Sequence, residues 1–155
     1  MVSLKYAHVE SERRFLLAAV PEVAVARTLH LTDRYLKGTH LRLRTVEEGG
    51  STVHKLGQKL RYDESEPSTN THTTLYLDAG EHALLSGLPA WTIRKTRLLL
   101  ATESHWAVDS FASGLVLAET EGSDGPPFAY VCEVTDDVRY SGAELAKVDG
   151  QRPVV

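Results

Sequence analysis

The chain has 155 residues, 42% of them hydrophobic and 25% charged, so it can bury the core of one domain, and we expect residues 1–155 to form one domain. The formal net charge of −4 argues against a protein that coats nucleic acid, because such proteins carry a basic domain or stripe. No apolar run approaches the ~18 residues of a membrane span. A single cysteine, Cys132, permits no internal disulfide, and we expect a cytoplasmic protein that does not bind membranes.

Apolar and polar residues alternate along most of the chain, which predicts β-strands. Turn-like glycine segments such as 48–50 and 112–114 separate them. Pro21 to His30 predicts a helical turn or an irregular link. The stretch from Asp63 to Thr74 has no apolar residue and predicts a flexible hairpin tip or lid, or a disordered loop. The expected strands are residues 6–17, 28–36, 40–46, 52–60, 73–78, 91–101, 105–111, 115–121 and 129–135.

Two capping pairs predict short helices. Asp78 with Glu81, and Ser141 with Glu144, have the spacing of a helix N-terminus. No helix alternates regularly with the strands, so a parallel α/β sheet is not expected. The fold class is therefore mainly β, with an antiparallel sheet and a few short helices.

Charged residues repeat on one face of several strands. Residues two apart on a strand point the same way, roughly 6–7 Å from each other. One such pair is commonly solvated, but four pairs on separate strands favour a shared charged interior, with the apolar face outward under helices and loops. Such an interior must hold water or ligand, because unpaired charges in a dry core are too costly. The pairs are Glu10 with Glu12, Arg42 with Arg44, Lys95 with Arg97, and Glu119 with Glu121.

The two kinds of charge point to two kinds of ligand. Carboxylates are hard oxygen ligands suited to Mg²⁺ or Mn²⁺. Arginine and lysine suit phosphate oxygens. Metal ions that bridge the oxygens of a polyphosphate would reconcile both charge sets in one cavity. Lys59 and Arg61 either extend the basic lining or are solvated.

Residues 10–16, Glu-Ser-Glu-Arg-Arg-Phe-Leu, resemble the ExExK signature that opens the CYTH domains, also called triphosphate tunnel metalloenzymes. Further segments are similar to later motifs of that family, in the family's order, and the resemblance covers residues 9 to 146. These segments are residues 32–36, 41–44, 53–55, 94–97, 108–111, 115–121 and 137–141.

The resemblance implies an eight-stranded antiparallel β-barrel tunnel. It also implies metal-dependent hydrolysis of inorganic tripolyphosphate or a small organic triphosphate. Carried over by position, the metal ligands would be Glu10, Glu12, Asp109, Glu119 and Glu121. The phosphate-binding residues would be Arg14, Arg42, Arg44, Lys55, Lys95, Arg97 and Arg139. The catalytic residues would be Glu10, Glu12, Tyr35 and Lys95.

The chain departs from the family pattern at two places. Arg14 stands where the signature has lysine, and arginine cannot act as a general base. Residues 73–76, on the strand after Lys55, include no carboxylate, although family members often carry one there. Three other functions therefore stay open: an adenylate cyclase of the class IV type, a non-catalytic nucleotide- or polyphosphate-binding module, and an ordinary β-sandwich with solvated charges. The sequence does not decide between a monomer and a homodimer.

Overall fold

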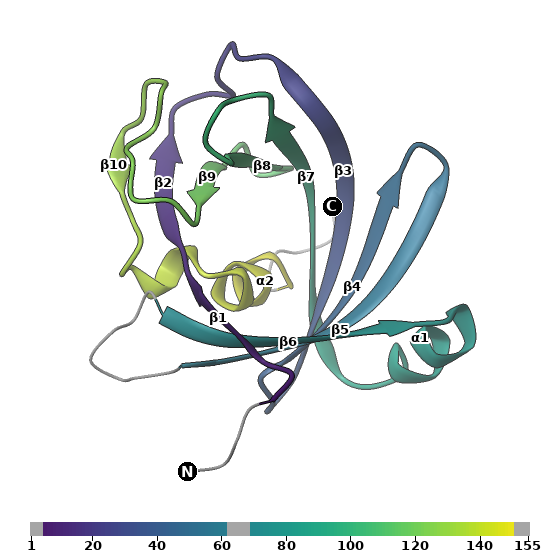
Figure 1. Ribbon diagram of the computed structural model, residues 1–155. Coiled ribbons are helices and arrows are strands. Elements are labelled where there is room, and N and C mark those ends of the chain that lie inside the picture. The colour runs from purple at the N-terminus through teal and green to yellow at the C-terminus, as the bar shows by residue number, and fades with distance from the viewer. Residues whose placement is uncertain (1–4, 62–68, 151–155) are drawn as a thin grey trace.

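The computed structural model describes residues 5–61 and 69–150, and within them one antiparallel sheet contains all ten strands. The sheet order is β1-β6-β5-β4-β3-β7-β8-β9-β2-β10 (Figure 1). The strands are β1 (His8–Ser11), β2 (Arg13–Leu17), β3 (Val25–Leu36), β4 (Leu41–Glu48), β5 (Ser51–Arg61), β6 (Thr69–Leu77), β7 (Ala90–Leu100), β8 (Ala107–Phe111), β9 (Val116–Thr120) and β10 (Cys132–Glu133). The helices are α1 (Ala79–Leu85), the 3₁₀ turn η1 (Val138–Tyr140) and α2 (Gly142–Gly150).

One continuous stretch of chain joins the two ends of this sheet. β1 pairs with β6, and β2, which follows directly after Glu12, pairs with β9. The sheet therefore curls into a barrel-like tunnel (Figure 1). In the described part of the chain, eight strands form the wall if β1 and β2 count as one segment, and the two-residue β10 lies outside β2. The expected mainly antiparallel barrel is confirmed.

The hydrophobic core lies on the outer side of one wall of the barrel. Phe15 of β2, Val108 of β8 and Ala118 of β9 each alternate with charged residues that point inward. They pack with Trp106, and Val23 and Phe128 of the connecting segments cover them. A fully buried large apolar side chain stabilises the fold by about 2 kcal/mol, so this outer cluster allows the inner face to remain charged.

Both predicted capping pairs form. Asp78 accepts a hydrogen bond from the backbone N–H of Glu81 (2.8 Å), and the Glu81 carboxylate accepts one from the N–H of Asp78 (3.0 Å), which begins α1. Ser141 accepts a hydrogen bond from the N–H of Glu144 (3.3 Å) at the start of α2, which packs against β7 and β3. Among the described residues, no helix is long and apolar enough to cross a membrane.

Two expectations about connecting segments were wrong. The expected link from Pro21 to His30 becomes a strand from Val25 onward, because this stretch pairs with the end of β7. The polar stretch after Asp63 is a strand from Thr69 onward, since polar side chains such as His72 face a hydrophilic barrel interior instead of an apolar core. Residues 62–68 lie outside the described residues.

A substitution at Gly142 tests how the start of α2 packs against Tyr35. A Cβ at this position would collide with the ring and hydroxyl of Tyr35, whereas a Cβ at Gly125 would meet open space. We expect Gly142→Ala to lower the free energy of unfolding by about 1–3 kcal/mol, measured by urea denaturation. Gly125→Ala is the control and should be nearly neutral. Equal stability of the two variants would contradict this packing.

Candidate functional site

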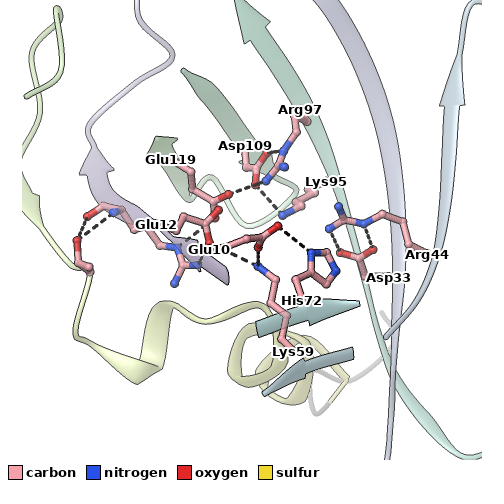
Figure 2. A network of polar contacts seen from close by, with 12 residues as sticks. Glu10, Glu12, Asp33, Arg44, Lys59, His72, Lys95, Arg97, Asp109 and Glu119 are labelled. Carbon is pink, nitrogen blue, oxygen red and sulfur yellow. Dashed lines mark hydrogen bonds and ion pairs between the residues drawn. The ribbon is translucent and has the colours of Figure 1, made fainter. Parts of the chain in front are cut away.

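The barrel interior contains a cavity of about 780 Å³, and most of the residues predicted from the sequence line it. Their side chains come from opposite walls and converge on one network of charges (Figure 2). The predicted residues that line the cavity are Glu10, Glu12, Arg14, Tyr35, Arg42, Arg44, Lys95, Arg97, Glu119 and Glu121.

Three predicted site residues do not line this cavity. Asp109 points inward but is covered by Lys95 and Arg97, and it is only 1% exposed. Lys55 shares the inner face of β5 but lies 5.3 Å from the ring centroid of Tyr76, beyond the cavity lining. Arg139 of η1 pairs with Asp137 at 2.6 Å, and its side chain is 80% exposed. Their roles as ligands of metal or phosphate stay predictions.

Asp33 fixes the arginines on one wall. It is 1% exposed and accepts hydrogen bonds from Nε (2.6 Å) and Nη2 (2.8 Å) of Arg44. Burial opposes ionisation of Asp33, but the positive charges of Arg44, Arg42 and Lys95 outweigh it and lower its pKa to about 2. Arg44 is therefore held as part of the framework.

Arg42 is less constrained than Arg44. Its Nε is 4.0 Å from Asp33 and, within the described residues, is buried without a hydrogen-bond partner. This Nε is covered, so an anion in the cavity would be held by the other guanidinium nitrogens of Arg42, which Asp33 does not bind in the bidentate way it binds Arg44. Of these two arginines, Arg42 is better placed to bind an anion.

Asp109 of β8 holds two cations of β7 in the way that Asp33 holds Arg44. It accepts hydrogen bonds from Nε and Nη2 of Arg97, both at 2.7 Å, and lies 2.6 Å from Nζ of Lys95. Burial lowers the pKa of Lys95, although Asp109 opposes that shift. Asp109 is positioned to orient both cations.

Carboxylates on the facing wall lie close together. Arg14 Nε donates to Glu119 Oε1 (3.1 Å), and Arg14 Nη2 lies 3.7 Å from Glu12. Burial opposes ionisation of Glu119, but Arg97, with Lys95 and Arg14, holds its pKa well below the usual range. The negative charge of Glu119, and then burial, raises the pKa of Glu12. The two carboxylates thus repel each other, and a cation bound between them would reduce that repulsion.

Two cavity residues that sequence reasoning did not place there contact Glu10. His72 Nδ1 lies 3.0 Å from Glu10 Oε1, and Lys59 Nζ lies 3.5 Å from Glu10 Oε2 and 3.6 Å from Glu12 Oε2 (Figure 2). Lys59 shares a strand face with Lys55, a signal that is compatible with lining the cavity but more often belongs to a solvated residue. His72 was hidden in the polar stretch, and Asp33 could have been found because it alternates with Tyr35 on an inward face.

The donor chemistry of this cavity fits a hard divalent cation. Glu10, Glu12, Glu119 and Glu121 all line it and offer oxygen atoms, the ligands preferred by Mg²⁺ and Mn²⁺. The Lys59 ammonium already lies against two of these carboxylates as a stand-in cation. In residues 5–61 and 69–150, no three His, Cys, Asp or Glu side chains are yet gathered as a ligand set, so side chains would have to turn toward the ion.

Comparison with solved structures identifies the fold. Two crystal structures of the protein NE1496 superpose with TM-scores of 0.58 and 0.57, at 25% and 24% identity over 88% of this chain and 97% of theirs. One is described as a hypothetical protein and the other as an inorganic triphosphatase. This chain has the same fold as NE1496.

A more distant structure supports the same fold. The protein PH1819 of Pyrococcus horikoshii OT3 has a TM-score of 0.58 at 16% identity, covering 75% of this chain and 79% of its own. No family model matches the sequence, and no curated protein matches it. The likeness therefore shows that the chain shares the fold of NE1496 and PH1819.

The Asp33–Arg44 pair tests the charged framework. Asp33→Asn leaves a buried guanidinium without its carboxylate, and we expect it to lower the free energy of unfolding at neutral pH by about 3 kcal/mol. Because the folded pKa of about 2 lies below the reference value of 3.8, this stabilisation is present above about pH 4 and is lost as the pH falls toward 2.

Urea denaturation across this pH range measures the effect. The difference in stability between wild type and Asp33→Asn should narrow as the pH falls from about 4 to about 2. Asp124→Asn, on an exposed loop, is the control and should change little at any pH. A difference for Asp33→Asn that stays constant over the range would contradict the assignment.

Proposed function

We propose that this protein is a divalent-metal-dependent hydrolase of inorganic tripolyphosphate or a small organic triphosphate. The observation that supports it best is the arrangement of charge in the cavity. Cations from β4 and β7 face carboxylates from the β1–β2 stretch and β9 across one space. A polyanion alone would satisfy only the cations, and a metal ion alone only the carboxylates. A triphosphate with its metal satisfies both.

Each group in the cavity has a chemical part in this reaction. Arg42, Lys95 and Arg97 would hold phosphoryl oxygens and stabilise the negative charge that develops as the bridging P–O bond breaks. Asp33 and Asp109 would keep these cations oriented. A divalent cation held by the glutamates would offset phosphoryl charge and make an attacking water more acidic.

The protein's own proton acceptors are limited. Arg14 stays protonated and cannot act as a base. Burial, with the charge of Asp33, raises the pKa of Tyr35, so its hydroxyl stays protonated at neutral pH. Toward a phosphate oxygen, Tyr35 can therefore act as a hydrogen-bond donor. Neither Arg14 nor Tyr35 is therefore the base for the attacking water, whose proton would go to a cavity carboxylate such as Glu12 or to the substrate.

Glu12→Gln tests the hydrolase proposal. Removing this charge relieves the repulsion from Glu119, so we expect the fold to be at least as stable while metal-dependent phosphate release falls roughly hundredfold. The assay uses tripolyphosphate, thiamine triphosphate and ATP with Mg²⁺ or Mn²⁺, with a chelator as blank. Glu47→Gln, an exposed carboxylate on β4, is the matched control and should keep full activity.

Other products or none would change the assignment. Cyclic AMP and pyrophosphate from ATP would identify a cyclase. Tight binding of tripolyphosphate without release of phosphate from any substrate would sink the hydrolase proposal and favour a binding module. Arg14 motivates the binding module as the second candidate. It forms an ion pair with Glu119 and cannot act as the general base that hydrolysis would use.

Arg42 and Arg44 should differ in their effects. Arg42→Gln should weaken tripolyphosphate binding by roughly tenfold or more with little loss of stability, because Arg42 lacks a full set of partners. Arg44→Gln should mainly destabilise the fold, because it leaves Asp33 buried without its bidentate partner. Calorimetric titration and urea denaturation measure the two effects. Equal loss of affinity and of stability in both variants would contradict the distinction.

A further inference from the structure

Lys59 occupies the position of a cation in the candidate metal site. It comes from β5, and its Nζ reaches Glu10 Oε2 at 3.5 Å and Glu12 Oε2 at 3.6 Å on the opposing β1–β2 stretch (Figure 2). Both carboxylates are proposed metal ligands. The ammonium thus bridges the two groups that a divalent cation would also have to contact.

Lys59 and a divalent cation cannot share these carboxylates. Two positive charges about 4 Å apart repel each other strongly in a partly buried site, where the effective dielectric constant is far below that of water. The Lys59 side chain is 37% exposed and flexible, so it can leave. His72 also contacts Glu10, so Glu10 keeps a partner when the ammonium moves away.

The ammonium that leaves needs another anion. Arg42 and Arg61 line the same cavity and repel the ammonium, and His72 is already in contact with Glu10. The phosphate oxygens of a bound triphosphate would provide the negative charge. Metal entry and triphosphate binding would then favour each other, because the metal displaces Lys59 from the carboxylates and the triphosphate gives the displaced ammonium a new partner.

We infer that Lys59 is an internal counter-ion that excludes free divalent metal from Glu10 and Glu12, so that the protein takes up metal together with triphosphate. Lys59 is thereby a specificity-determining residue of the site. This inference rests on the proposed function, because it takes the glutamates as metal ligands and a triphosphate as substrate.

The direct test measures Mn²⁺ binding without phosphate, by electron paramagnetic resonance of the free ion. Lys59→Met keeps the apolar stem and removes the charge, and we expect it to bind Mn²⁺ at least roughly tenfold more tightly than the wild type. Arg61→Met removes a cation two residues along the same strand face and should change the affinity only about twofold. Lys59→Arg should bind Mn²⁺ as weakly as the wild type.

The coupling is measured with the non-hydrolysable bis-methylene analogue of tripolyphosphate. The analogue should raise the Mn²⁺ affinity of the wild type by a larger factor than that of Lys59→Met. Chelation of Mn²⁺ by the free analogue is the same for both proteins and cancels in the comparison.

Three results would overturn the inference. The first is that Lys59→Met binds Mn²⁺ no more tightly than the wild type, or not at all. The second is that Arg61→Met gains as much Mn²⁺ affinity as Lys59→Met. The third is that the analogue raises the Mn²⁺ affinity of the wild type and of Lys59→Met by the same factor. Neither readout needs turnover. The hydrolase proposal is tested by phosphate release and the Lys59 inference by Mn²⁺ binding, so the failure of one can be told from the failure of the other.

Discussion

Asp33 and Asp109 are buried carboxylates that must be paired inside the barrel, and the charged interior is built around them. A buried charge without a partner is strongly destabilising, so Asp33 requires Arg44, and Asp109 requires Arg97 and Lys95. These pairs cross from β4 to β3 and from β8 to β7. The network continues through Glu119 to Arg14, so positive and negative side chains meet around most of the interior. The cavity is thereby preorganised for a ligand that carries both signs of charge.

The same arrangement would allow an acidic chain to hold the proposed polyanion. The net charge of −4 describes the whole sequence, whereas the cavity concentrates cations such as Arg42 and Lys95. The apolar core is displaced to the outer face around Phe15 and Trp106, where connecting segments cover it. Charge inside and core outside is the reverse of an ordinary β-sandwich, and it requires an interior that holds water or ligand.

Local sequence signals predicted much of this architecture. Alternation predicted most strands, Asp78 and Ser141 predicted the two helix starts, and charges two residues apart, such as Glu10 with Glu12, predicted the inward face. These signals depend only on neighbours along the chain. They also led to the polar stretch being read as a loop, because alternation is invisible when both faces of a strand are polar, as they are around His72.

Contacts across the barrel could not be predicted in this way. The bridge from Lys59 to Glu10 and Glu12 depends on how the sheet curls and on β6 lying beside β1, and no short-range pattern encodes that. The contacts of Asp109 depend on the same geometry, since its register opposite Arg97 places its carboxylate against Arg97 and Lys95. Its expected role as a metal ligand stays a prediction. Most of the charged residues that line the cavity were thus predicted from the sequence, whereas their pairing was not.

The central claim is that the cavity binds a triphosphate with its metal and cleaves it. Phosphorus-31 NMR of tripolyphosphate tests it most directly, because the same spectrum reports binding and products. The account predicts that protein shifts or broadens the tripolyphosphate resonances, and that Mg²⁺ then converts them to orthophosphate and pyrophosphate in equal amounts. Tripolyphosphate resonances that stay sharp, unshifted and uncleaved with folded protein and Mg²⁺ would contradict it.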